Sequence, residues 1–82
     1  MAYFVYILKS VKDNKYYIGS TSDVKARVNF HNSGRQLSTK NRIPFVLVYK
    51  EELTTKSEAL KREMQIKSYK SGNAFKKLIE GV

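Results

Sequence analysis

The stretch YFVYILKSVKDNKYYIGS, residues 3–20, decides the fold. Residues 3–9 and 15–20 are rich in β-branched and aromatic side chains, which favour strands. The polar segment between these two runs is typical of a turn. The stretch therefore predicts a β-hairpin.

The expected register of this hairpin brings two tyrosines together. With the loop at residues 10–13, Tyr6 lies directly opposite Tyr17. Because side chains alternate between the two faces of a sheet, both phenols are then expected on the same face.

The middle of the chain predicts a helix, a loop and a strand. Residues 24–33 form the expected helix, preceded by hydroxyls suited to an N-cap and followed by Gly34 as its stop. The basic residues 35–43 contain no acid and are expected to form a loop. Residues 45–50 predict a third strand, apolar on both faces and therefore partly covered from two sides.

Two further helices complete the expected order. Residues 55–58, Thr-Lys-Ser-Glu, match a capping box and open a helix that runs to about Tyr69. Asn73 can cap a last short helix whose Phe75 and Leu78 share one side. The expected order is β-β-α-β-α-α, which is an α+β fold.

Length and composition exclude several classes of protein. The chain has 82 residues, which fits one small domain. It has no cysteine and one histidine, which excludes disulfides, thiolate nucleophiles and multi-histidine metal centres. The longest apolar run is too short to span a membrane, and the first residues lack a signal-peptide pattern. We therefore expect a soluble, cytoplasmic protein with no membrane partner.

The charge balance points to polyanions. Sixteen Lys and Arg residues against seven Asp and Glu residues leave a net charge of +9 and a pI of about 9.9. Such an excess is expected of a protein that neutralises phosphates. The alternative is a solvated basic surface with no partner, which charge by itself does not exclude.

Polar side chains interrupt the apolar face of the first expected helix. The stripe at helical spacing contains Val24, Arg27, Val28 and His31, so that two of four positions on the sheet-facing side are polar. Burying a guanidinium without a partner is costly. Either these residues belong to a functional site, or Arg27 extends past the sheet edge and His31 is a hydrogen-bonded core histidine.

The second long helix repeats this pattern with an acid. Glu63 falls between Ala59, Leu60 and Ile66 on the apolar face, whereas Glu58 falls on the solvent side. A salt bridge to Arg27 or Lys67 would explain it structurally. A buried acid also often marks a functional site. The candidate polar cluster therefore consists of Tyr6, Tyr17, Arg27, His31 and Glu63.

Several motifs in fixed order resemble the GIY-YIG nuclease family. Tyr17-Ile18-Gly19 follows Phe4-Val5-Tyr6, Arg27 comes eight residues after the glycine, and residues 31–34 match an H-N-x-G segment. Residues 57–67, SEALKREMQIK, resemble the family's E-A-L-x-x-E-x-x-I-K stretch. The likeness runs from Tyr3 to about Ile79. It is closest to short stand-alone members, similar to the N-terminal nuclease domain of UvrC excinuclease and to YhbQ-type proteins.

The resemblance implies both a fold and a site. Residues 1–82 are expected to form a single GIY-YIG-like domain with a small three-stranded antiparallel sheet flanked by helices. By motif position, Tyr6 and Tyr17 correspond to the family tyrosines and Arg27 to the catalytic arginine, with His31 near the site. Glu63 corresponds to the glutamate that binds a divalent metal, Mg²⁺ or Mn²⁺. Tyr6, Tyr17 and His31 all remain candidates for the general base. Asn73 is the only counterpart of an asparagine that some members carry.

The resemblance implies a metal-dependent DNA endonuclease acting in repair, recombination or DNA degradation. The alternatives are a nucleic-acid-binding module on the same scaffold and a structural partner protein. Single-stranded or branched DNA is the expected substrate, and a homodimer or a partner protein would improve the grip of so small a domain. The expected phosphate contacts are Lys25, Arg35, Lys40, Arg42, Lys67 and Lys70.

Overall fold

The computed structural model describes residues 2–37, 39–69 and 72–80. Within these residues the order of elements is β-β-α-β-α-α, which confirms the predicted α+β architecture. The elements are β1 (Tyr3–Ser10), β2 (Tyr16–Thr21), α1 (Val24–Asn32), β3 (Phe45–Leu53), α2 (Lys56–Ser68) and α3 (Asn73–Glu80). A short 3-10 helix, η1 (Lys40–Arg42), lies inside the segment expected to be a loop.

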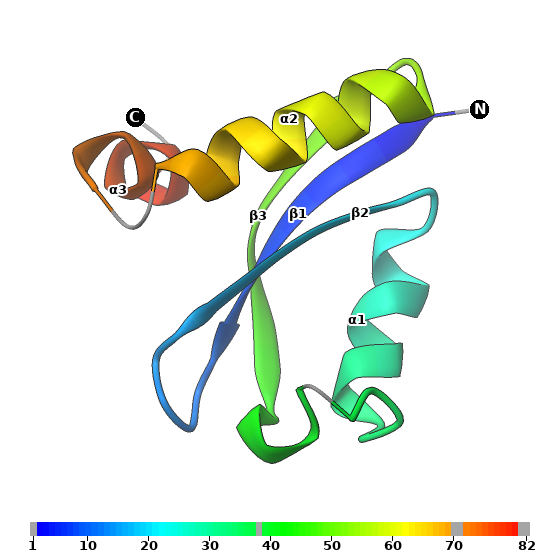
Figure 1. Ribbon diagram of the computed structural model, residues 1–82. Coiled ribbons are helices and arrows are strands. Elements are labelled where there is room, and N and C mark those ends of the chain that lie inside the picture. Colours follow the sequence, from blue (N-terminus) through cyan, green and yellow to red (C-terminus); the bar gives the residue numbers. More distant parts are fainter. Residues whose placement is uncertain (1, 38, 70–71, 81–82) are drawn as a thin grey trace.

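The three strands form one antiparallel sheet in the order β2-β1-β3. Helix α1 lies on one face, and α2 and α3 cover the other (Figure 1). The central strand is therefore enclosed on both sides, and residues 5–8 are all buried. Alternate side chains of β1 consequently serve two separate packing layers.

Two apolar clusters fill these layers. On the α2 and α3 side, Val5 and Ile7 pack with Ala59, Ile66 and Phe75. On the α1 side, Tyr6 and Leu8 pack with Phe45, together with partly buried neighbours that include Tyr17 and Val28. The α1 side is the one that contains phenols and the histidine.

The hairpin register differs from the prediction by two positions. Tyr6 pairs with Gly19, and Tyr17 pairs with Leu8. The loop lies one residue further along the chain than expected, because it closes between Ser10 and Lys15, whose backbone N and O atoms are 2.8 Å apart. Since a shift of two positions preserves the alternation of side chains, both tyrosines still occupy one face.

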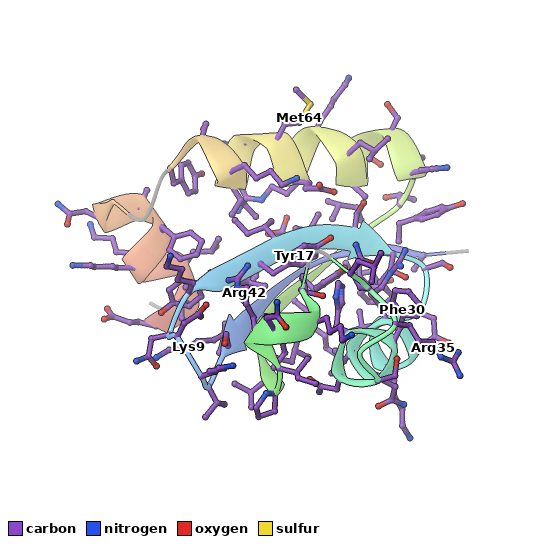
Figure 2. The ribbon with its side chains drawn as sticks, turned by 60° about the horizontal axis from the view of Figure 1, so that its bottom comes forward. Lys9, Tyr17, Phe30, Arg35, Arg42 and Met64 are labelled. Carbon is purple, nitrogen blue, oxygen red and sulfur yellow. The ribbon has the colours of Figure 1, made fainter. Side chains whose placement is uncertain are left out.

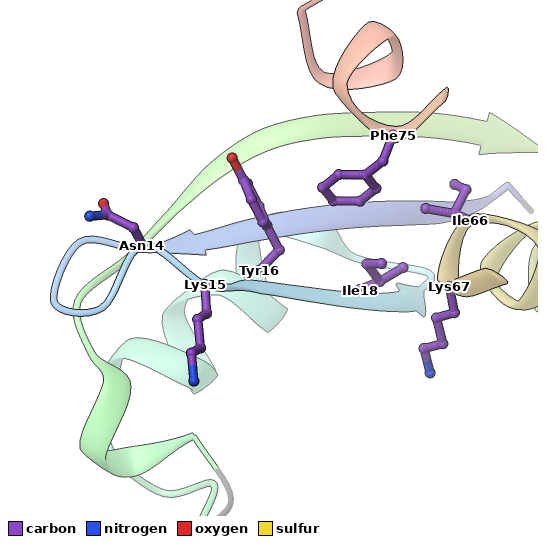
Figure 3. A pocket seen from close by; sticks show the side chains of 7 residues that line it. All are labelled: Asn14, Lys15, Tyr16, Ile18, Ile66, Lys67 and Phe75. Carbon is purple, nitrogen blue, oxygen red and sulfur yellow. The ribbon is translucent and has the colours of Figure 1, made fainter. Parts of the chain in front are cut away.

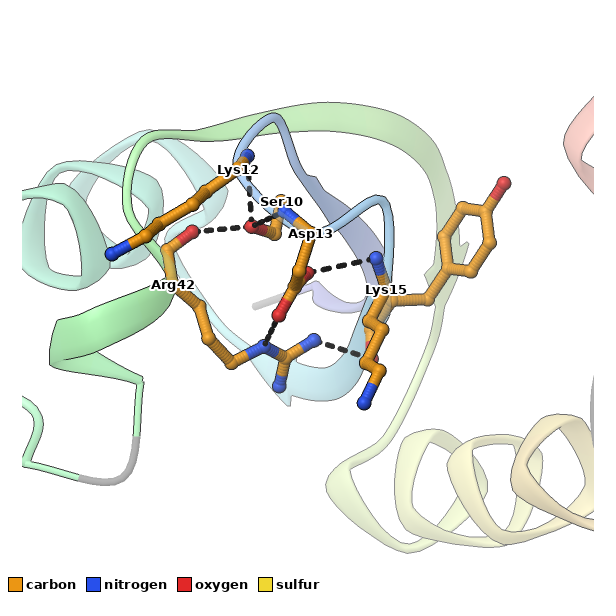
Figure 4. Close-up of polar contacts among 6 residues, drawn as sticks. Ser10, Lys12, Asp13, Lys15 and Arg42 are labelled. Carbon is orange, nitrogen blue, oxygen red and sulfur yellow. Dashed lines mark hydrogen bonds and ion pairs between the residues drawn. The ribbon is translucent and has the colours of Figure 1, made fainter.

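The tight turn of this hairpin depends on the buried Ser10. Its hydroxyl accepts hydrogen bonds from the backbone N–H of Lys12 and Asp13 at 3.2 Å and donates one to the Arg42 carbonyl (Figure 4). Asn14 completes the turn with a positive φ of 61°. A contact from a distant segment therefore takes part in fixing the turn.

Strand β3 extends three residues beyond the predicted end at Lys50. Glu51 and Glu52 continue the strand because they pair with Val5 and Phe4 of β1. The cover of β3 is partial, as predicted, since Val46 and Leu47 remain 45% and 40% exposed. The reason is that β3 is an edge strand rather than a central one.

The helix ends follow local sequence signals. Asp23, rather than a preceding hydroxyl, caps α1 by accepting from the Ala26 N–H at 3.0 Å. The predicted capping box between Thr55 and Glu58 is present at the start of α2. Leu60, expected on the apolar face of α2, is 45% exposed. No helix in residues 2–37, 39–69 or 72–80 is long and apolar enough to cross a membrane.

Candidate active site

Tyr6 is the centre of the candidate active site. Its side chain is 2% exposed and crosses directly over Gly19 of the neighbouring strand. A β-carbon at Gly19 would lie 2.6 Å from the Tyr6 hydroxyl oxygen, so the glycine makes room for the phenol. This contact gives a physical reason for the glycine of the Tyr-Ile-Gly motif.

The phenol of Tyr6 is held in its neutral form. Burial raises its pKa well above the ordinary value, with further contributions from Tyr17 and Glu63 that outweigh the opposing effect of Arg27. Arg27 therefore lowers the pKa of Tyr6 by less than burial raises it. Tyr17, Arg27 and Glu63 thus all lie within electrostatic range of Tyr6.

His31 connects Tyr6 to the segment before η1. The ring is 1% exposed, with Nε2 3.4 Å from the Tyr6 hydroxyl and Nδ1 3.2 Å from the Thr39 hydroxyl. The Thr39 hydroxyl in turn donates to the Gln36 carbonyl at 3.4 Å. Each donor meets an acceptor when Nδ1 carries the proton and Nε2 accepts from Tyr6.

Electrostatics favours the same protonation state of His31. Burial lowers its pKa, and the positive charge of Arg27 lowers it further. His31 is thus the hydrogen-bonded buried histidine that was one of the two alternatives. Its partner, however, is a tyrosine of the candidate cluster. The Nε2 lone pair of the neutral imidazole accepts the hydrogen bond of the Tyr6 hydroxyl, so it is placed to receive the proton of that hydroxyl.

Tyr17 lies against both of these groups. Its ring centroid is 4.6 Å from that of His31 and 6.4 Å from that of Tyr6, with an angle of 27° between the two phenol planes. Tyr17 is half-buried, on the α1 side of the sheet (Figure 2). The two phenols and the imidazole therefore form one aromatic group, in which Tyr17 is the more accessible phenol.

Arg27 supplies a cation beside this aromatic group. It lies one turn of α1 before His31, is half-buried, and has its guanidinium 5.7 Å from the Phe30 ring. No carboxylate in the described parts of the chain is within ion-pair distance of it. With Thr21, Asp23 and Phe30 it borders a shallow depression of about 250 Å³. An unpaired arginine at such a place is suited to bind a phosphate.

Glu63 contributes the acid from α2. Its side chain is 17% exposed, and Oε2 accepts a hydrogen bond from the Lys67 ammonium at 2.7 Å. Of the two salt bridges considered for Glu63, the one to Lys67 is therefore formed and the one to Arg27 is not. The pair shows that this carboxylate holds a cation in the folded protein.

Glu63 would be a sparse metal site. Across residues 2–37, 39–69 and 72–80, no group of three or more His, Cys, Asp or Glu side chains is placed to hold a metal ion. Mg²⁺ tolerates one carboxylate because it keeps several waters and takes further ligands from a substrate phosphate. The donor set at Glu63 fits that ion, provided that Lys67 moves aside.

The expected phosphate contacts fall into different environments. Arg35 and Lys40 are exposed. Lys25 borders a depression with Leu47 and Lys50 of β3, away from the depression beside Arg27. Lys67 is 53% exposed despite its bond to Glu63. Lys70 lies outside the described residues.

Arg42 has a structural role that the sequence did not indicate. Its guanidinium forms an ion pair with Asp13 at 3.2 Å and donates to the Tyr16 carbonyl at 3.4 Å (Figure 4). These bonds tie η1 to the hairpin. Arg42 is therefore less available to a phosphate than Arg35. Asn73 is the exposed first residue of α3.

Thr39 is the residue that sequence reasoning missed. It is 1% exposed and joins His31 to the backbone of the basic segment. Its only signal in the sequence is a hydroxyl eight residues after the histidine, within a polar stretch. That spacing has no helical or strand meaning, because residues 33–37, which lie between the two, belong to no helix or strand.

The chain matches known proteins over most of its length. The family model of the GIY-YIG catalytic domain matches residues 2–76. A UPF0213 protein of Staphylococcus epidermidis is 50% identical over 96% of both chains, and one of Staphylococcus aureus is 52% identical over 83% of both. The solution NMR structure of a UPF0213 protein from Bacillus halodurans has a TM-score of 0.60 at 36% identity, covering 98% of this chain and 84% of that one.

Proposed function

Since the chain belongs to the GIY-YIG family, a nuclease family, we propose that it is a metal-dependent endonuclease that hydrolyses phosphodiester bonds in DNA. The observation that carries the proposal is the surroundings of Tyr6. One buried phenol has a neutral imidazole at 3.4 Å, and it lies within the influence of an arginine and a glutamate. These are the groups that phosphodiester hydrolysis needs.

Arg27 acts on the scissile phosphate. In the transition state, negative charge grows on the nonbridging and leaving oxygens, and a fixed guanidinium stabilises that charge more than the ground state. The lack of an ion-pair partner among the described carboxylates supports this role. Asp23, which lines the same depression, accepts from the Ala26 N–H instead. The depression beside Arg27 is where the phosphate is proposed to bind.

Tyr6 and His31 handle the proton of the attacking water. Because the raised pKa keeps the phenol neutral, Tyr6 accepts a proton only as it gives up its own. The proton of Tyr6 passes to His31 Nε2, and the water proton takes its place on the phenol oxygen. Thr39 keeps the lone pair of Nε2 directed at Tyr6 by accepting from Nδ1–H.

Glu63 is the residue proposed to hold the divalent ion. Bound there, Mg²⁺ or Mn²⁺ would neutralise charge on the phosphate. Lys67 then releases Oε2 and becomes free to contact the DNA backbone. The excess of +9 supports a polyanionic substrate. We place the activity in the cytoplasm, in repair, recombination or degradation of DNA, as in UvrC-like proteins.

A nucleic-acid-binding module is the second candidate. The observation that favours it is the ion pair at Glu63, because a lysine already neutralises the carboxylate that the nuclease would use for metal. In that case the basic surface binds DNA and no bond is cleaved.

Cleavage of labelled single-stranded, duplex and branched DNA with Mg²⁺, Mn²⁺ or EDTA separates the two candidates. Glu63→Gln keeps the side-chain shape but removes the anion, so the rate should fall at least ~10²-fold. Its DNA affinity should hold or rise, because a negative charge near the phosphate is gone. Glu52→Gln, an exposed acid on β3, is the matched control and should leave the rate unchanged.

If the wild-type protein binds DNA in Mg²⁺ and Mn²⁺ but cleaves no substrate above the Glu63→Gln background, the binding module replaces the nuclease.

A further inference from the structure

A groove lies on the α2 and α3 side of the sheet, opposite to the aromatic group of the candidate active site. Its volume is about 340 Å³ (Figure 3). The apolar part of its lining comprises Tyr16, Ile18, Ile66 and Phe75, and Lys15 and Lys67 stand at its rim. The proposed mechanism assigns no role to the apolar lining.

The lining selects for a flat, uncharged group. Ile66 and Phe75 are buried, and the Tyr16 and Phe75 rings meet edge to face with centroids 5.0 Å apart. Ile66 and Phe75 form the buried floor of the groove, and the half-buried Tyr16 and Ile18 are the apolar side chains that a ligand reaches. A planar ring gains dispersion and hydrophobic contacts there, whereas a charged group would lose its water without finding a partner.

The rim selects for an anion attached to that group. The ammonium groups of Lys15 and Lys67 project to the same side of β2, away from the Tyr16 and Phe75 rings and towards the two ends of the groove (Figure 3). Lys15 is exposed and Lys67 is 53% exposed, so both reach a ligand at the surface. A nucleotide combines the two features, since its base is planar and its phosphate is negative.

We propose that this groove binds an unpaired nucleotide of a DNA strand, with the base on the apolar surface and the backbone along Lys15 and Lys67. In a duplex the faces of each base are covered by stacked neighbours, so only an unpaired base offers a face to the groove. The charge of +9 is complementary to such a strand.

The groove leads to the candidate active site through Lys67. The ammonium that stands at its rim is the one bonded to Glu63 at 2.7 Å. A strand whose phosphate takes this ammonium weakens the bond to Glu63, and the next phosphates along the strand lie close to that acid. This part of the inference rests on the proposed function and makes an unpaired segment the preferred substrate.

Tryptophan fluorescence tests the groove without cleavage. The chain has no tryptophan, so Tyr16→Trp introduces a single reporter that keeps an aromatic ring against Phe75. In EDTA, a short single-stranded oligonucleotide should quench this reporter, and a blunt duplex of equal length should not. Tyr3→Trp, at the opposite end of β1, is the control and should stay unquenched. Equal quenching of both reporters, or by both DNAs, would overturn the proposal.

Affinity provides a second test that does not depend on the reporter. Lys15→Glu should weaken binding of single-stranded DNA in EDTA roughly fivefold or more relative to Lys61→Glu, an exposed residue of α2 with the same change in charge. Equal affinities of the two variants would show that Lys15, at the rim of the groove, does not contact the DNA backbone.

The outcomes separate the groove from the nuclease. Quenching of the Tyr16→Trp reporter without cleavage in Mg²⁺ or Mn²⁺ keeps the groove and rejects the proposed function. Cleavage without selective quenching rejects the groove and keeps the nuclease.

Discussion

The two faces of the sheet use the same central strand for different purposes. Tyr6 and Leu8 of β1 face α1, where a phenol, an imidazole and an arginine gather. Val5 and Ile7 face α2 and α3, where the packing is apolar. Adjacent residues of one strand thus serve reactive groups on one face and the apolar core on the other. The alternation of side chains along a buried strand is enough to keep the reactive groups apart from the apolar core.

The largest expected effect is on catalysis at the α1 face. Arg27→Ala should lower the DNA cleavage rate at least ~10²-fold, as expected when one electrostatic element of a site is lost. The melting temperature should change little, because the guanidinium has no ion-pair partner in the described residues. Lys61→Ala, which removes the same charge from an exposed residue outside the expected phosphate contacts, is the control. Equal loss of activity in both variants would mean that Arg27 acts only through net charge.

The contact of Tyr6 with Gly19 should make the α1 face intolerant of one added carbon. Gly19→Ala puts a methyl group 2.6 Å from the Tyr6 hydroxyl oxygen, and the buried ring has little room to move. We expect a loss of about 1–3 kcal/mol in the free energy of unfolding, measured by urea denaturation. Ser20→Ala is the neighbouring control. A Gly19→Ala protein as stable as this control would show that Tyr6 can shift freely.

Thr39 tests the hydrogen bonds behind the reactive groups. Thr39→Val keeps the shape but leaves His31 Nδ1 without its acceptor, which should cost about 1–3 kcal/mol of stability. Thr39→Ser should restore most of it. Because His31 is the single histidine, NMR of the imidazole nitrogens reports its protonation directly. An unchanged spectrum in Thr39→Val would contradict the role of Thr39 in fixing Nδ1–H.

A substitution on the α2 and α3 face should lower stability and leave the cleavage rate unchanged, which is the opposite of the effect expected for Arg27→Ala. Ile7→Val removes one methyl group from a fully buried side chain and should cost about 0.5–1.5 kcal/mol. The cleavage rate of the folded protein should stay at the wild-type value, because this side chain points away from Tyr6. Parallel measurements of the melting temperature and the cleavage rate check this. A loss of cleavage rate as large as that of Arg27→Ala would show that the α2 and α3 face also contributes to catalysis.

The smallest expected effect is the pH dependence of stability that the titration of His31 causes. Burial lowers its pKa in the folded protein below the ordinary 6.5, so the unfolded chain binds the proton more readily. The contribution to stability is complete above pH 6.5 and decreases as the pH falls from there toward the folded pKa. Urea denaturation at several pH values, with His31→Gln as the control, isolates the contribution of His31 to the free energy of unfolding. An identical pH dependence in both proteins would contradict it.

Local signals in the sequence predicted most of the elements. The capping box at Thr55 and the stop at Gly34 placed helix ends within about one residue. The expected hairpin register placed Tyr6 and Tyr17 on one face of the sheet, and the helical stripe placed Arg27 and His31 on one face of α1. These features depend on neighbours within a few positions, so the sequence contains the information directly.

Contacts between distant segments escaped prediction. The register moved by two positions because the Ser10 hydroxyl bonds to the Arg42 carbonyl and the loop closes one residue later in each strand. Strand β3 ran past its apolar residues because β1 offered it partners. In both cases the stabilising group lies more than thirty residues away in the chain.

The sequence by itself determined the order of elements, the family and the types of side chain at the candidate site. Tertiary structure alone decided their state: that Tyr6 and His31 are neutral, that Lys67 rather than Arg27 bonds to Glu63, and that Thr39 holds His31. The physical reason is that residue types and spacing are local properties. Protonation and partner choice depend instead on burial and on distances between elements, which exist only after the sheet and helices have packed.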